Sequence, residues 1–325
     1  MKRPPAASRR LDEAQAVALF RRTFAAPRAR GVLTGIGDDA AVLAAPAAPL
    51  VVTVDASVEG THFRRDFVAL ADIGFRAFQA AASDLAAMGA RPLAAVSALT
   101  LPRDFSASEL AELTRGQAEA SRVTGCPLVG GNVARAELLT LTTTVLGTAE
   151  RPLPRSGARP GDECWLVGEV GLAAAGLALL QRGKRRNGSA EQRCVRAWQR
   201  PCALIARGLG LVRVAHAAVD VSDGLAGDAA HLASASGCRL VLEEDAVRAA
   251  LPAALVTVAL RLGKDPLGLA LYGGEDYALV AAGPRAARPR WARRIGRFER
   301  GRGAFLENDG ERRAPLGGGF DHFKR

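Results

Sequence analysis

Prolines and glycines gather near the middle of this 325-residue chain, at Pro152, Pro154, Gly157, Pro160 and Gly161. Such residues interrupt helices and strands, and a cluster of them is typical of a segment that joins two domains. A chain of this length is too long for one ordinary domain and suits two of roughly 150 residues each. We therefore expect an N-terminal domain over residues 1–148 and a C-terminal domain over residues 149–325.

On both sides of this segment, the apolar residues switch between helical and strand periodicity. Before it we expect helices over residues 11–24, 69–88 and from Ser106 or Ser108 to 125, and strands over 50–54, 93–101, 126–129 and 138–147. After it we expect strands over residues 163–167, 217–221 and 239–243, helices over 171–180 and 224–236, and a polar loop over 184–191. The alternation predicts an α/β protein.

The net charge of +11 is the main argument for a nucleic-acid partner. The arginines, however, are scattered along the chain, and aromatic residues that could stack on bases make up only 5% of it. No uncharged run is long enough to cross a bilayer, and the N-terminus lacks the apolar segment of a secretory signal. The cysteines form no C-x-x-C pair. We therefore expect a cytoplasmic protein that binds neither nucleic acid nor a membrane.

Acidic residues at the ends of expected strands and in glycine-rich turns are the strongest chemical signal. They are Asp38, Asp39, Asp55, Asp84, Asp220, Asp223, Glu275 and Asp276. Carboxylates in such places are the ligands that Mg²⁺ shares with phosphates, whereas the simpler alternative is that each one caps a turn. The P-loop, G-x-S-x-G and H-E-x-x-H motifs are absent, so ordinary phosphate loops, hydrolase triads and zinc peptidases are poor candidates.

Eight ordered motifs contain all of these acidic residues. They are Gly37–Leu43, Asp55 with His62-Phe63, Ser83–Ala90, Gly130-Gly131, Arg155–Asp162, Asp220–Leu225, Gly273–Tyr277 and Gly319–Phe323. In order and spacing they resemble thiamine-monophosphate kinase, a family of the aminoimidazole ribonucleotide synthetase-like superfamily. The resemblance extends from about residue 31 to residue 323, which is nearly the whole chain.

The resemblance implies a two-domain α/β fold of the α+β type. It implies an N-terminal domain whose sheet pairs with that of a second subunit in a homodimer, and a second α/β domain at the C-terminus. Nucleotide and metals are then expected in a cleft between the domains, near the dimer interface. The implied activity is ATP-dependent phosphorylation of thiamine phosphate to thiamine diphosphate, with ATP as co-substrate and several Mg²⁺ ions as cofactors. Because the acceptor is an ionised phosphate oxygen, direct in-line transfer needs no general base.

Family roles carry over to matching positions of this sequence. The implied metal ligands are Asp38, Asp39, Thr53, Asp55, Asp84, Asn132, Asp220 and Asp223, among which Asp84, Asp220 and Asp223 are also the implied catalytic residues. The implied nucleotide contacts are Gly131, Asn132, Arg155 and Ser222, and the implied thiamine phosphate contacts are His62, Glu275 and Phe320. An aromatic ring at 320 suits stacking on a flat cationic ring, and Glu275 could offset the positive charge of that ring.

Each of these residues also has a simpler interpretation when it is taken alone. His62 could be an ordinary strand residue, Arg155 a solvated charge, Phe320 a core residue and Glu275 part of a turn. Only the joint pattern favours the functional roles.

Two positions depart from the family pattern. Asn132 follows Gly130-Gly131 where the family usually has Asp, and Val54 precedes Asp55 where the family commonly has a hydroxyl. Both changes fall on one metal site. An alternative is therefore a catalytically weakened protein of the same fold that binds nucleotide or thiamine phosphate. Selenophosphate synthetase is disfavoured because the first cysteine is Cys126, and the hydrogenase-maturation relative is disfavoured because the chain ends without a cysteine.

Overall fold

The computed structural model describes residues 11–24, 31–36, 39–183, 188–316 and 318. Its residues form two compact units, one made of 1–81 and 92–147 and the other of 82–91 and 148–325. The short segment Ala82–Arg91, which includes Ser83 and Asp84, thus belongs with the second unit.

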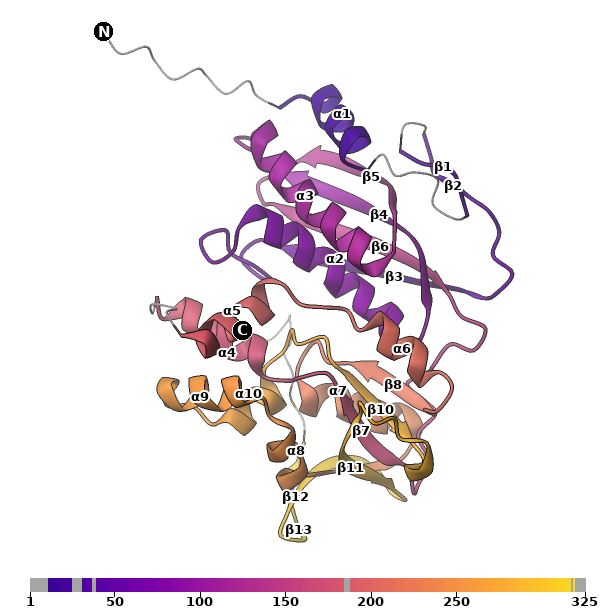
Figure 1. Ribbon diagram of the computed structural model, residues 1–325, viewed down its shortest axis with the longest axis vertical. Coiled ribbons are helices and arrows are strands. Elements are labelled where there is room, and N and C mark those ends of the chain that lie inside the picture. The colour runs from indigo at the N-terminus through magenta and orange to yellow at the C-terminus, as the bar shows by residue number, and fades with distance from the viewer. Residues whose placement is uncertain (1–10, 25–30, 37–38, 184–187, 317, 319–325) are drawn as a thin grey trace. The chain divides into compact units, whose positions relative to one another are not determined.

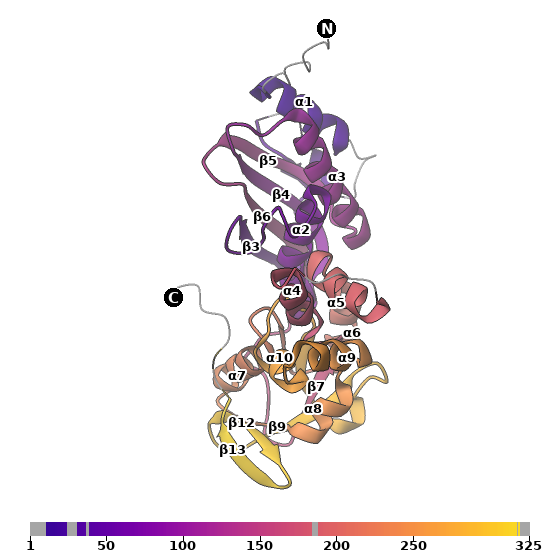
Figure 2. The same cartoon turned by 90° about the vertical axis from the view of Figure 1, so that its left-hand side faces the viewer.

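The first unit contains a four-stranded sheet, as far as its described residues go, in the order β3-β6-β4-β5. Its strands are β3 (Leu50–Val58), β4 (Arg91–Leu101), β5 (Leu128–Arg135) and β6 (Thr140–Thr148), and a separate pair is formed by β1 (Val32–Thr34) and β2 (Val42–Leu43). The helices are α1 (Glu13–Thr23), α2 (Leu70–Ala87) and α3 (Ala107–Thr124). Figures 1 and 2 show α2 and α3 on the same face of the four-stranded sheet.

Helix α3 illustrates how local sequence sets an element. The Ser106 hydroxyl accepts from the N–H of Glu109, and the Glu109 carboxylate accepts from the N–H of Ser106, which together make a capping box. The helix ends at Gly125, whose φ of 66° is the left-handed conformation that favours glycine. The helix expected to begin at Ser106 or Ser108 and to end at 125 is confirmed, with Ser106 as its cap.

The second unit contains a seven-stranded sheet, within its described residues, in the order β13-β12-β9-β11-β7-β10-β8. The strands are β7 (Glu163–Val167), β8 (Ala217–Asp220), β9 (Arg239–Glu243), β10 (Leu279–Gly283), β11 (Arg293–Glu299), β12 (Gly303–Asn308) and β13 (Glu311–Pro315). Its helices are α4 (Leu172–Gln181), α5 (Ser189–Gln199), α6 (Ile205–Leu211), α7 (Leu225–Ser236), α8 (Glu244–Ala250), α9 (Ala253–Leu262) and α10 (Pro266–Tyr272), with a 3₁₀ turn at Arg285–Ala287. The two units together confirm the expected two-part α/β fold.

Two expectations about local structure are wrong. The strand expected over 126–129 starts at Leu128 and continues to Arg135, so Gly130, Gly131 and Asn132 lie inside β5 rather than in a loop after it. The loop expected over 184–191 gives way to α5 at Ser189, while residues 184–187 lie outside the described part. The apolar signal of α5 is weak because this helix buries only a narrow stripe of Glu191, Cys194, Val195 and Trp198.

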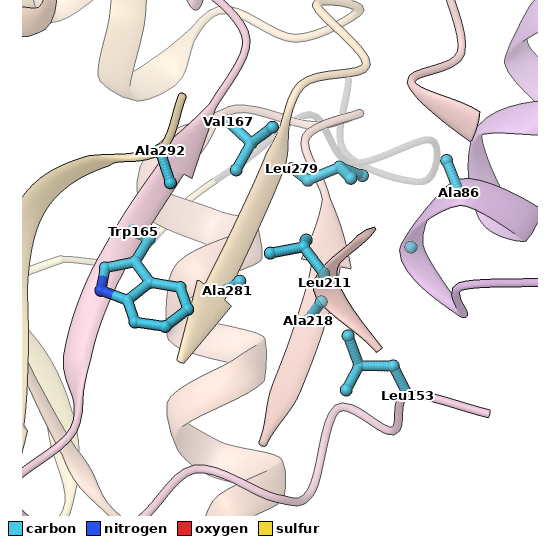
Figure 3. Close-up of a cluster of buried hydrophobic side chains, with 10 residues drawn as sticks. Ala86, Leu153, Trp165, Val167, Leu211, Ala218, Leu279, Ala281 and Ala292 are labelled. Atoms are coloured by element: carbon cyan, nitrogen blue, oxygen red, sulfur yellow. The ribbon is translucent and has the colours of Figure 1, made fainter. Parts of the chain in front are cut away.

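A buried apolar cluster packs the end of α2 against the second sheet. Ala86 and Ala87 of α2 belong to one buried cluster with Trp165 and Val167 of β7 and with side chains of β8, β10 and α6. Figure 3 shows Ala86 and Trp165 on opposite sides of this cluster. Burying a large apolar side chain contributes about 1.5–3 kcal/mol. This packing fixes the last turn of α2, which carries Ser83 and Asp84, next to the strands of the second unit.

Across the part of the chain that the structure describes, no helix combines the length and the apolar character that crossing a membrane requires.

Candidate functional site

The predicted site residues are divided between the two units. The first unit holds Asp39, Thr53, Asp55, His62, Gly131 and Asn132, and the second holds Asp84, Arg155, Asp220, Ser222, Asp223 and Glu275. Asp38 and Phe320 lie outside the described residues.

Strand β3 carries the predicted ligands Thr53 and Asp55. Successive side chains of a strand point to opposite faces, so Thr53 and Asp55 share one face while Val52 and Val54 share the other. Val54 is 61% exposed, whereas Thr53 and Asp55 are half-buried. The side chain of Val54 therefore points away from the face of β3 that carries the Asp55 carboxylate. Only the backbone of residue 54 is available on that face.

His62 lies in the turn after β3, not in a strand. The N–H of Val58 donates to its Nδ1 at 3.1 Å. Because Nδ1 accepts, the neutral ring carries its proton on Nε2. The ring is half-buried, and its orientation is set by this bond to the end of β3.

Gly131 and Asn132 lie in β5, which pairs with β4 in parallel, with Gly131 opposite Ser97. A Cβ atom at Gly131 would collide with the carbonyl oxygen of Ser97, and its φ of 156° is one that other residues rarely adopt. Glycine is therefore required there by the sheet itself. Asn132 is exposed.

The clearest geometry of the second unit joins the end of α2 to the end of β8. The hydroxyl of Ser83 donates to Oδ2 of Asp220 at 2.7 Å, and both residues are buried. Asp84 is the next residue, and its charge acts on Asp220. Two predicted carboxylate ligands are thus brought together by packing between segments far apart in the sequence.

Burial, followed by the neighbouring charge of Asp84, raises the pKa of Asp220 to about 7. The Ser83 hydrogen bond and the positive charge of Arg155 oppose this shift. A second carboxylate beside a buried one makes the ionised form costly unless a cation balances the charge. The Asp84–Asp220 pair therefore fits a hard divalent cation such as Mg²⁺, which typically binds one or two carboxylates together with substrate phosphates.

The described residues contain no group of three or more His, Cys, Asp or Glu side chains that could hold a metal ion.

The turn after β8 is held by a residue that sequence reasoning missed. Oδ2 of Asp228 in α7 accepts from the backbone N–H groups of Ser222, Asp223 and Gly224 at 3.1, 3.0 and 3.2 Å. Burial raises the pKa of Asp228 to about 6, although these N–H groups favour its ionised form. An acidic residue in the first turn of a helix that begins after Ser-Asp-Gly was the available signal.

Glu275 lies in a second turn, which leads into β10. Its φ is 69°, a left-handed conformation that costs a residue other than glycine about 1–3 kcal/mol. The N–H of Glu275 donates to the carbonyl of Ser222 at 2.7 Å, and a Cβ at Gly274 would collide with that same carbonyl. Strands β8 and β10 are antiparallel neighbours, and the last residue of β8, Asp220, lies opposite the first residue of β10, Leu279. The turn after β8 and the turn before β10 therefore lie at the same end of these two strands.

Two further contacts fix the turn at Glu275. The Asp276 carboxylate accepts from the N–H groups of Gly171 and Ala173 at 2.6 and 3.1 Å, at the start of α4. The indole N–H of Trp198 donates to Oε2 of Glu275 at 2.6 Å. No local sequence signal pointed to Trp198.

Arg155 is exposed, and its carbonyl accepts from the Ser236 hydroxyl at 2.9 Å. This bond ties the segment before β7 to the end of α7. The guanidinium charge acts on Asp220, so Arg155 is not merely a remote solvated cation.

Comparison with known proteins agrees with this architecture. Residues 37–149 match the family model described as AIR synthase related protein, N-terminal domain, and residues 159–305 match the corresponding C-terminal domain. A thiamine-monophosphate kinase from Aquifex aeolicus is 34% identical over 293 residues, which cover 89% of this chain and 92% of that protein.

Solved structures give the same result. The thiamine-monophosphate kinase from Stenotrophomonas maltophilia has a TM-score of 0.81 and 33% identity, with 93% of this chain and 98% of that chain covered. A structure described as AaThiL complexed with AMPPCP and TMP has a TM-score of 0.80 and 31% identity, with 99% of each chain covered. This chain therefore belongs to the thiamine-monophosphate kinase family of the AIR synthase related proteins.

Proposed function

We propose that this protein transfers a phosphoryl group from ATP to thiamine phosphate, giving thiamine diphosphate and ADP. One observation carries the proposal. In this member of the kinase family, the buried Asp220 lies beside Asp84 and accepts a hydrogen bond from Ser83. The solved relative with AMPPCP and TMP supports ATP and thiamine phosphate as the two substrates.

We assign Asp84 and Asp220, with Asp223 on the adjoining turn, to Mg²⁺ binding and catalysis. We assign Asp38, Asp39, Thr53, Asp55 and Asn132 to further metal ligation. Nucleotide contacts are assigned to Gly131, Asn132, Arg155 and Ser222, and thiamine phosphate contacts to His62, Glu275 and Phe320. These roles follow the family positions, and the contacts around Asp220, Ser222 and Glu275 support them.

Charge repulsion between two polyanions is the main obstacle to this reaction. Bound Mg²⁺ would neutralise phosphate oxygens of donor and acceptor. The chain itself contributes the Asp220 carboxylate, which accepts a hydrogen bond from Ser83, and a positive charge at Arg155. It also contributes Asp223, whose backbone N–H is held by Asp228. The acceptor oxygen is already ionised near neutral pH, so in-line attack needs no protein base.

A direct test mixes the purified protein with ATP, Mg²⁺ and thiamine phosphate and follows thiamine diphosphate by chromatography. Multiple turnovers per protein molecule are expected. Absence of product, while ATP or thiamine phosphate still binds in calorimetry, would favour the second candidate, a binding protein of the same fold. Asn132 and Val54 are the observations that keep this second candidate open.

We also propose that the protein is a cytoplasmic homodimer with domains 1–148 and 149–325. Leu50, Val52 and Val54 form an exposed apolar row on one face of the edge strand β3, which supports sheet pairing with a second subunit. Analytical ultracentrifugation of Val52→Asp should show a shift toward the monomer. A dimer as stable as that of the wild type would contradict the assignment of this face.

A further inference from the structure

The turn that carries Glu275 is held rigidly on its backbone side. The N–H of Glu275 is bonded to Ser222, and the next residue, Asp276, accepts from backbone N–H groups at the start of α4. Tyr277 is also left-handed, with φ of 51°, and its N–H donates to the carbonyl of Val221 at 2.8 Å. The backbone is thereby fixed, but these bonds do not orient the carboxylate of Glu275.

Trp198 supplies that orientation from a different element. It lies on the buried stripe of α5 and is only 2% exposed. Its indole N–H donates to Oε2 of Glu275 at 2.6 Å, across 77 positions of the sequence. A hydrogen bond to an ionised carboxylate is shorter and stronger than one between neutral groups, and a buried indole requires an acceptor.

We propose that Trp198 is a positioning residue for thiamine phosphate, acting by holding the Glu275 carboxylate in its binding orientation. This inference rests on the proposed function, in which Glu275 faces the cationic part of thiamine phosphate. A free glutamate side chain must lose rotamer freedom when it binds a ligand, and a carboxylate that is already held avoids much of that loss. The indole N–H therefore acts on substrate affinity through Glu275.

The same unit contains a matched pair that serves as a control. The indole N–H of Trp165 donates to Oε2 of Glu163 at 3.0 Å, and Glu163 also accepts from Arg288 at 2.8 Å. Trp165 lies within the buried cluster on β7, and neither residue has a proposed role in binding. Loss of this bond should affect stability alone.

The first test compares Trp198→Phe with Trp165→Phe, since each replacement keeps an aromatic ring and removes the N–H donor. For Trp198→Phe, we expect the KM and the calorimetric Kd for thiamine phosphate to rise about tenfold, while the KM for ATP changes less than about twofold. Trp165→Phe should leave both KM values unchanged. Equal effects on both substrates, or an unchanged Kd in Trp198→Phe, would overturn the inference.

A double-mutant cycle tests whether Trp198 acts through Glu275. Glu275→Ala should weaken thiamine phosphate binding, and adding Trp198→Phe to it should cause no further loss. Additive losses would show that Trp198 acts elsewhere and would overturn the inference.

A third measurement keeps Trp198 and so does not depend on the folding of its variant. The chain has three tryptophans, so Trp165→Phe with Trp291→Phe leaves Trp198 as the single indole fluorophore. Thiamine phosphate should shift its emission, and this shift should disappear when Glu275→Ala is added. No shift, despite calorimetric binding, would overturn the inference alone, whereas absence of both binding and turnover in the wild type would overturn the proposed function as well.

Discussion

The hydroxyl of Ser83 and the carboxylate of Asp220 form a 2.7 Å hydrogen bond between residues 137 positions apart. This bond joins the last turns of α2 to the end of β8, where the charge of Asp84 also acts on Asp220. A buried carboxylate beside a second carboxylate is costly for folding and valuable for binding a cation.

Asp220→Asn should abolish activity and stabilise the metal-free protein. The pKa of Asp220 lies near 7 when folded and near 3.8 when unfolded, so between these values the folded state holds a proton that the unfolded state has lost. The free energy of unfolding therefore falls as pH rises from about 4 to about 7. Asp228 and Asp276, with pKa values raised to about 6 and about 7, contribute with the same sign.

Urea unfolding at several pH values would check this prediction for Asp220. The Asn variant can still accept from Ser83 and should gain about 1–3 kcal/mol at pH 8. It should also show a flatter decline with pH. Mg²⁺ should raise the Tm of the wild type and not that of the variant. A variant less stable than the wild type at pH 8 would contradict the argument.

Asp84→Asn should lower kcat by about 10²–10³-fold because it removes half of the proposed cation-binding pair. Its circular dichroism and Tm should remain close to those of the wild type. Asp72→Asn, which removes a carboxylate from the first turn of the same helix, is the matched control and should retain activity. Near-full kcat in Asp84→Asn would remove Asp84 from the catalytic site.

Asp228→Ala should destabilise the protein by about 2–4 kcal/mol, because the partly buried backbone N–H groups of Ser222 and Asp223 and the buried N–H of Gly224 lose their acceptor. It should also reduce kcat, since the turn with Asp223 and Ser222 loses its support. Asp228→Asn keeps one acceptor oxygen and should be milder in both measurements. Ser106→Ala removes a helix cap in the first unit and should cost about 1 kcal/mol without affecting kcat.

Asn132→Asp should lower the Mg²⁺ concentration needed for half-maximal rate by several-fold, because it adds a negative charge at a proposed metal ligand. Ala134→Asp places the same charge two residues along β5, on the same exposed face, and serves as the control. An equal effect of both variants would mean that net charge, and not ligation at 132, is responsible. If neither variant changes the Mg²⁺ dependence, this position does not take part in metal binding.

Local sequence determined those parts of the fold that depend on neighbouring residues. The helix that ends at 125 was predicted with Ser106 or Ser108 as its cap, because a capping side chain and a terminal glycine lie within the helix ends themselves; the structure selects Ser106. Strand β7 was predicted over its full length, 163–167, from an apolar run that is buried on both faces. The ordered motifs predicted the family, since their spacing is a property of the chain and needs no coordinates.

Tertiary structure decided which of these residues meet. The bonds from Ser83 to Asp220 and from Trp198 to Glu275 cross 137 and 77 positions, and no local pattern encodes them. The sequence did not indicate a role for Trp198, because α5 buries only a narrow stripe of side chains in an otherwise polar segment. Part of that segment was expected to be a loop. Partners so distant in sequence are selected by packing of α2, α5 and the second sheet, because only the folded core brings such groups within hydrogen-bond distance.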